Sequence, residues 1–271
     1  MATVGEKMLA AVPPPPEGSK DAEILDKYQA IMDSYKDEHG HRDEYKMTWT
    51  AELLATKLKT NIDEVKAAKT LDWGWKELIH IHAEALGDLL SMAENCVNLN
   101  MFVNEVGSEG GKAIARAMPH MKKLVQVDLQ QWQIKPEGAK HVAEALRTHP
   151  RIKSIKMHYC HLGWEGTEYI ARAAANHKTL TNLDLGDNGM DEEGARHIIA
   201  MLHTNTSLTR LDVSKNEGLV DNPEVLSWFK GEVQKACMTR PTPLNLICEN
   251  NPGKKWHPND KPPPPCREEE W

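Results

Sequence analysis

Cysteine and histidine are the residue types in this 271-residue chain with the most obvious capacity for catalysis or metal binding. His158, Cys160 and His161 lie together, but alternation along a strand turns Cys160 inward and His158 outward. His80 and His82 are two residues apart, which points them in different directions on a helix. The chain has no H-E-x-x-H motif and no Cys/His zinc spacing. The sequence therefore predicts solvated or core-bonded histidines and no bound metal.

The other motifs of catalytic sites are also missing from the sequence. It contains no G-x-S-x-G elbow and no glycine-rich phosphate loop. Asp184, Asp187 and Asp212 could gather on one face and bind a cation, although a solvated acidic patch is the simpler interpretation. The sequence thus predicts a protein that is not an enzyme, with no cofactor and no small-molecule substrate.

One apolar pattern is written five times through the middle of the chain. Its copies run from Cys96 to Asn104, Leu124 to Trp132, Ile152 to Cys160, Leu180 to Asn188 and Leu208 to Asn216. Their starting positions are 28 residues apart, and a Glu-Gly pair keeps the same step at Glu109, Glu137, Glu165 and Glu193. Two markers in phase identify a repeat protein.

Each repeat divides into two halves of different periodicity. The L-x-x-L-x-L half alternates apolar and polar residues, which predicts a short strand with one buried face. The half after Glu-Gly has helical spacing, as in Val142, Ala145 and Leu146. Because one such unit cannot bury its own apolar stripe, the copies must stack into a solenoid with a row of parallel strands.

These repeats resemble the leucine-rich repeats, specifically the ribonuclease-inhibitor-like subtype. Leu180 to Asn188 and Leu208 to Asn216 are similar to that family's consensus, and the resemblance covers residues 96–251. It implies an α/β solenoid with a curved parallel β-sheet on the concave side and α-helices outside. These repeats serve many unrelated partners, so the resemblance indicates the fold and names no ligand.

The sequence divides into four regions. Residues 1–20 form a proline-rich arm, 21–95 a helical N-terminal cap with a possible degenerate first repeat, 96–252 the repeats with a C-terminal capping half-repeat, and 253–271 a second proline-rich arm. Expected helices span residues 21–36, one beginning after Thr50, 62–69, 76–94 and 224–237. Region 21–95 could instead be a separate docking element. Each arm could bind a partner or be a solvated tail.

Net charge, hydropathy and cysteine content indicate which partners and which cellular compartment to expect. A net charge of −7 and a pI near 6.0 argue against nucleic acid as a partner. No apolar run reaches the length of a membrane span, and the N-terminus lacks a signal-peptide core. Five cysteines without paired spacing indicate reduced thiols and an intracellular, reducing compartment. We expect the cytoplasm or a cytoskeletal or ciliary structure, with an organelle interior left open.

The repeat phase also predicts a binding surface. Variable positions beside the strands should point to the concave side, with Phe102 and Tyr159 as aromatic anchors. Trp132 occupies a position that usually holds asparagine in this family, and it could fill a local widening or turn outward to a partner. The candidate partner-binding residues are Phe102, Gln130, Gln131, Trp132, Lys156, His158, Tyr159, Asp184, Asp187, Arg210 and Trp271. The alternative is a merely solvated sheet.

Taken together, the sequence predicts a non-catalytic scaffold subunit that contacts several proteins in a larger assembly through the concave face and the arms. The alternative is a reversible regulatory binder, such as an inhibitor or a cytoskeletal protein resembling the actin pointed-end cappers. A subunit built permanently into an assembly should be unstable alone, whereas a regulatory binder should be a well-behaved monomer.

Overall fold

The computed structural model describes residues 47–248, together with Ala30. The two predicted arms, the rest of the predicted helix at 21–36, and the candidate residue Trp271 lie outside the described residues.

Short strands and helices alternate along the described chain. The strands are β1 (Thr70–Asp72), β2 (Asn98–Asn100), β3 (Gln126–Asp128), β4 (Ser154–Lys156), β5 (Asn182–Asp184), β6 (Arg210–Asp212) and β7 (Asn245–Ile247). The helices are α3 (Ala51–Lys57), α4 (Ile62–Ala67), the 3-10 turn η2 (His80–His82), α5 (Ala83–Ser91), α6 (Gly107–Ala117), α7 (Lys135–Thr148), α8 (Gly163–Ala175), α9 (Glu192–Thr204), α10 (Glu217–Val220) and α11 (Pro223–Met238).

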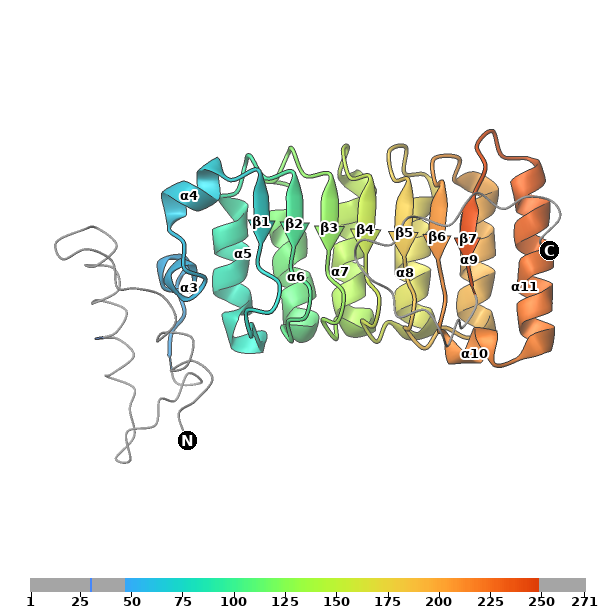
Figure 1. The fold of residues 1–271 in the computed structure, drawn as a ribbon, viewed down its shortest axis with the longest axis horizontal. Coiled ribbons are helices and arrows are strands. Elements are labelled where there is room, and N and C mark those ends of the chain that lie inside the picture. The colour runs from blue at the N-terminus through green and yellow to red at the C-terminus, as the bar shows by residue number, and fades with distance from the viewer. Residues whose placement is uncertain (1–29, 31–46, 249–271) are drawn as a thin grey trace, which may run out of the picture.

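The seven strands form one open parallel sheet in chain order, which confirms the predicted α/β solenoid. Leu99 pairs with Val127, and Val127 with Ile155, so neighbouring strands are in register 28 residues apart. Helices α5 to α9 and α11 stand in a second row behind the sheet (Figure 1). The central residue of each strand faces this helical row and is buried, from Leu71 through to Leu246.

The Glu-Gly pairs mark the point where each helix meets the loop before it. A Cβ on Gly110 would lie 2.5 Å from Cβ of Val106, and one on Gly138 would lie 2.7 Å from Cγ2 of Ile134. Gly166 and Gly194 have the same relation to the buried residue four positions earlier. Any side chain here would lift the helix from the core, and this explains the periodic glycine.

The N-terminal end of the sheet begins one repeat before Cys96. Leu71 pairs with Leu99 at the same 28-residue step, so β1 belongs to the sheet. Helices α3 and α4 precede it and begin at the predicted residues, with Thr50 and Asn61 as their N-caps. The buried side chains of α3 pack beside α5 and cover the end of the helical row.

The helix expected over residues 76–94 is wrong in its first part. Residues 76–79 form a loop, η2 follows, and α5 begins only at Ala83. The Leu78 backbone N–H donates to Oδ1 of Asn104 in the next repeat, at 3.0 Å. Loop geometry repeated from the neighbouring copies therefore outweighs the local helical pattern. At the other end, α11 runs over the predicted range with one extra residue at each end.

Candidate interaction surface

The sheet has one face that the helices do not cover (Figure 1). Along each strand, side chains point alternately to the two faces of the sheet, so the polar and charged residues lie on this face and the apolar ones are buried on the other. They pair across strands: Asn100 Nδ2 donates to Asp72 Oδ1 at 2.8 Å, and Lys156 Nζ lies 3.2 Å from Asp128 Oδ2. This face is an ordered array of polar groups on a rigid support.

The carboxylates at the strand ends also shape the turns that follow. Oδ1 of Asp184 accepts the Gly186 N–H at 3.1 Å, and Oδ1 of Asp212 accepts the Ser214 N–H at the same distance. Burial and then the charge of Asp184 raise the pKa of Asp212, and hydrogen bonds from Ser214 oppose that rise. The predicted acidic patch is therefore partly structural, because Asp184 and Asp212 hold Asx-type turns.

His158 lies at the centre of the charged part of this face. Its Nδ1 is 3.4 Å from Oδ1 of Asp184, and its Nε2 is 3.9 Å from Oδ2 of Asp187. Burial alone would lower the pKa of His158, but the hydrogen bond to Asp184 and the charges of Asp184 and Asp212 outweigh it and raise the pKa above 6.5. Gly186 makes room for the ring, since a Cβ there would lie 2.4 Å from Nδ1 of His158.

A row of residues with positive φ follows the strands, and we call it the strand-end row. Its members are Trp75, Val103, Gln131, Tyr159, Asp187 and Lys215. They are 28 residues apart, and their φ values lie between 54° and 59°. The left-handed conformation is costly for residues other than glycine, and most of all for a β-branched one such as Val103. The same left-handed turn in six copies gives these six residues equivalent backbone positions at one edge of the sheet.

Aromatic side chains stand out in and beside the strand-end row. Trp75 is 65% exposed and Tyr159 43% exposed. The Trp75 ring contacts the half-buried Phe102 edge-on, with centroids 5.7 Å apart, and Tyr159 contacts His161 in the same way at 4.9 Å. Sequence reasoning missed Trp75, although its 28-residue distance from Val103 was a usable signal.

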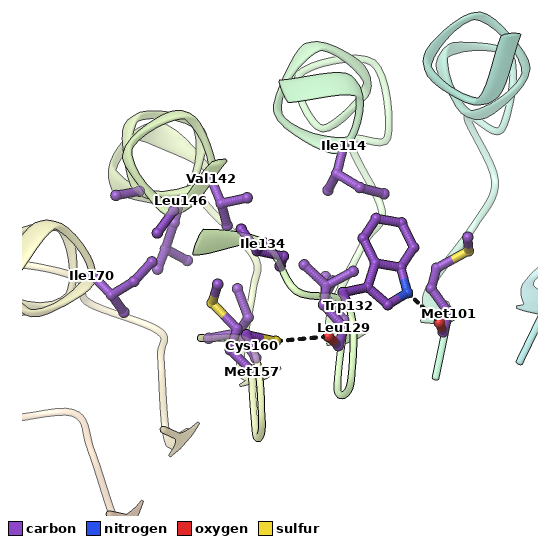
Figure 2. Close-up of a cluster of buried hydrophobic side chains, with 14 of the residues drawn as sticks. Met101, Ile114, Leu129, Trp132, Ile134, Val142, Leu146, Met157, Cys160 and Ile170 are labelled. Atoms are coloured by element: carbon purple, nitrogen blue, oxygen red, sulfur yellow. Dashed lines mark hydrogen bonds between the residues drawn. The ribbon is translucent and has the colours of Figure 1, made fainter. Parts of the chain in front are cut away.

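Trp132 corrects one of the predicted contacts. It is 0% exposed and lies in the core, so its side chain is not available to a partner. Figure 2 shows its indole nitrogen directed at the carbonyl of Met101, to which it donates a hydrogen bond. Asn104, Asn188 and Asn216 donate in the same way to the carbonyl 31 residues before them, and so does the Cys160 thiol, to Leu129 (Figure 2). Trp132 thus replaces asparagine as the donor of this ladder.

Gln130 is the second correction. It is 5% exposed, and its Nε2 donates to both carboxylate oxygens of Asp128 at 3.0 Å. Of the other predicted residues, Gln131 and Tyr159 are exposed, and Phe102, Lys156, His158, Asp184, Asp187 and Arg210 are half-buried. These eight lie on or directly after strands β2 to β6.

A second ladder, along the opposite edge of the sheet, was not foreseen. His149 and His177 are buried, 28 residues apart, and the buried Asn205 follows at the same step. Nε2 of His149 donates to the Met121 carbonyl at 3.2 Å, while its Nδ1 accepts the Arg151 N–H at 3.4 Å. The repeated spacing of these residues was visible in the sequence, but the prediction left open whether each histidine is solvated or bonded in the core.

Burial shapes the remaining titratable groups in the core. It raises the pKa of the Cys160 thiol to about 12 and that of Cys96 to about 11, so both stay protonated near neutral pH. Within residues 47–248, no group of three or more carboxylate, histidine or cysteine side chains is arranged to hold a metal ion. The helices of the same range include none with the length and apolarity to cross a bilayer.

A match to a family model supports the repeat architecture. A family model described as Leucine Rich repeat matches residues 176–198 and 204–221. A solved structure titled Leiomodin-1 Actin-Binding Site 2 (ABS2) is similar at 19% sequence identity, covering 52% of this chain and 78% of that one, with a TM-score of 0.43. Among curated protein sequences, none matches the chain significantly.

Proposed function

We propose that this chain is a non-catalytic scaffold subunit of a larger protein assembly. It is built of leucine-rich repeats, a fold used for protein-protein interaction. The partner would lie on the uncovered sheet face and on the strand-end row. We assign the repeats to the ribonuclease-inhibitor-like subtype because their period is 28 residues and each carries a helix. A reducing intracellular compartment suits the buried free thiols of Cys96 and Cys160.

The observation that carries this proposal is the pair of aromatic anchors in the strand-end row. Trp75 and Tyr159 are large and exposed, and each ring packs edge-on against a neighbour, Phe102 and His161 respectively. These contacts restrict the rings, so less conformational entropy would be lost when a partner covers them. Aromatic side chains held in this way are frequent hot spots of interfaces. The charged groups beside Tyr159, centred on His158 and Asp184, would set orientation more than affinity.

The test compares tagged full-length chains purified gently from the source cell. The double variant Trp75→Asn/Tyr159→Asn removes both aromatics, and asparagine tolerates the positive φ at these positions. The control is Trp164→Ala, which removes an aromatic of similar exposure, 41%, from the first turn of α8. Size separation and quantitative mass spectrometry then report what elutes with each chain.

We expect the wild type and the control to elute with one set of proteins through salt washes, and the double variant to lose at least part of that set. Elution of the wild type near its monomer mass of 30.5 kDa would reject the scaffold in favour of a reversible regulatory binder. If all three chains retained the same proteins equally, the binding surface would lie outside the strand-end row.

A further inference from the structure

The two long edges of the solenoid carry opposite charge. The turns from strand to helix, with the first helical turns that follow them, are rich in exposed acids: Glu77, Glu105, Glu109, Glu137, Glu165, Asp191, Glu192 and Glu193. The turns from helix to strand, along the upper edge in Figure 1, are rich in exposed bases. The net charge of −7 alone does not indicate this separation of charge between the two edges.

The bases concentrate around three neighbouring strands, β3 to β5. We call them the basic stripe, which consists of Lys122, Lys123, Arg147, Arg151, Lys153 and Lys178. The Lys153 N–H donates to the Val125 carbonyl at 2.8 Å, so adjacent turns stay in register as they leave the sheet. Equivalent backbone positions, such as those of Lys123 and Arg151, are then about 5 Å apart.

The basic stripe is not neutralised by the described part of the molecule. Over residues 47–248, no carboxylate lies within 4.0 Å of any of its six cationic groups. Lys123 instead donates from Nζ to the neutral amide oxygen of Asn95 at 2.6 Å. The acidic edge differs, because Arg196 lies within ion-pair distance of both Glu192 and Glu193.

Compensation of helix dipoles accounts for only part of the basic stripe. Cations stabilise a helix C-terminus within its last turn, and Arg147 meets this condition in α7. Lys123 lies beyond the C-cap Met118 of α6, and Lys153 beyond the C-cap His149 of α7. These cations repel one another in adjacent turns, a cost that a bound anion would remove.

We propose that the basic stripe is a second docking surface, which binds a short acidic segment of a partner protein. Three adjacent turns span about 10 Å of backbone, and an extended peptide covers that span with three or four residues at about 3.3 Å each. An acidic peptide fits better than nucleic acid because the turns that carry the stripe, residues 119–125, 147–153 and 175–181, contain no Trp, Tyr or Phe on which bases could stack. The acidic edge and the negative net charge would also repel a long polyanion.

The test measures binding of a fluorescent peptide of about six glutamates, long enough to cross the stripe at about 3.3 Å per residue, to the full chain. The triple variant Lys123→Gln/Arg151→Gln/Lys153→Gln neutralises the stripe. The matched control Lys112→Gln/Lys140→Gln/Arg172→Gln removes the same charge from exposed positions on α6, α7 and α8 of the same repeats. A glutamine peptide and a single-stranded RNA of equal charge complete the set of probes.

We expect the wild type and the control to bind the glutamate peptide with affinities that fall as salt rises, and the stripe variant to bind it at least about tenfold more weakly. If both variants bound the glutamate peptide equally weakly, net charge alone would explain the loss of affinity, and the proposal would be overturned. Tighter binding of the RNA than of the peptide would overturn it in favour of nucleic acid. The Trp75→Asn/Tyr159→Asn variant should keep its affinity for the glutamate peptide, so this surface and the strand-end row are tested separately.

Discussion

At the scale of single residues, the donor ladder shows that a hydrogen-bonding role can outlast a change of residue type. Asn104, Trp132, Cys160 and Asn188 each donate to a carbonyl 31 residues earlier, although an amide, an indole and a thiol differ in size and shape. The larger indole also fills core volume beside the first turn of α6, where a Cβ on Gly110 would meet Trp132 at 2.9 Å. Trp132 is therefore both a packing residue and a ladder donor.

Replacing Trp132 with phenylalanine should destabilise the fold measurably. The change removes one of two donors to the buried Met101 carbonyl, which keeps its hydrogen bond from Nδ2 of Asn104 at 2.7 Å. The lost hydrogen bond should cost about 0.5–1.5 kcal/mol, and the smaller ring adds the cost of a cavity. Urea denaturation of the full chain should show a lower midpoint with an unchanged slope. The control Trp164→Phe, at an exposed site, should stay within about 0.5 kcal/mol of wild type. An equal, small effect of both changes would contradict the ladder role.

At the scale of elements, the turns from helix to strand are joined by the second ladder. Asn205 makes both kinds of bond in this ladder. Its side-chain amide donates to the Ala174 carbonyl at 2.7 Å, and its Oδ1 accepts the Leu208 N–H at 2.8 Å. His177 accepts the Leu180 N–H at Nδ1 in the same way. Arg240 ends the ladder by donating to the carbonyls of Leu202, Asn205 and Leu208.

This second ladder should make the protein sensitive to acid. Burial lowers the pKa of both His149 and His177, and the neighbouring charges of His177 and Arg151 lower that of His149 further. A folded-state pKa below the unfolded value means that the unfolded chain binds more protons, so stability falls as pH drops through 6.5. Protonation at Nδ1 would also remove the acceptor of the backbone N–H groups.

The variant His149→Asn/His177→Asn should weaken that pH dependence, because asparagine can serve the ladder as Asn205 does without titrating. Free energies of unfolding measured at several pH values below 7 should decline less steeply than in wild type. The control His120→Asn/His203→Asn removes two exposed histidines and should keep the wild-type slope. If both double variants had the wild-type slope, the acid sensitivity would originate elsewhere.

At the scale of the whole molecule, the solenoid depends on cover at its ends. Each repeat contacts only its neighbours, so an uncovered end exposes core surface. Helix α3 covers the α5 end of the helical row, and Leu54 in it is completely buried. Trp49, just before α3, is buried against the ring of His82, with centroids 4.3 Å apart.

Shortening a buried side chain of α3 should therefore destabilise the first repeats. Leu54→Ala is expected to cost about 2–5 kcal/mol, as large-to-small changes in a core do. Hydrogen exchange should then show faster loss of protection in β1 and α5 than in β5 and α9, because coupling passes between nearest neighbours. The exposed change Glu52→Ala in the same helix serves as control. Unaltered exchange in β1 would indicate that α3 is a separate docking element.

The sequence alone determined the period, the alternation of strand and helix, the parallel sheet and the side of each strand that is buried. These properties follow from apolar spacing, which is local and recurs in every repeat. The tertiary structure decided the place of Trp132 and Gln130 inside, the exposure of Trp75, and the loop at residues 76–79. It also decided the buried ladder through His149 and His177 and the basic stripe along the same edge. The ladders and the unpaired charges depend on residues about one repeat apart, because a neighbouring turn either supplies the hydrogen-bond partner or leaves a charge unpaired, and no single segment contains that information.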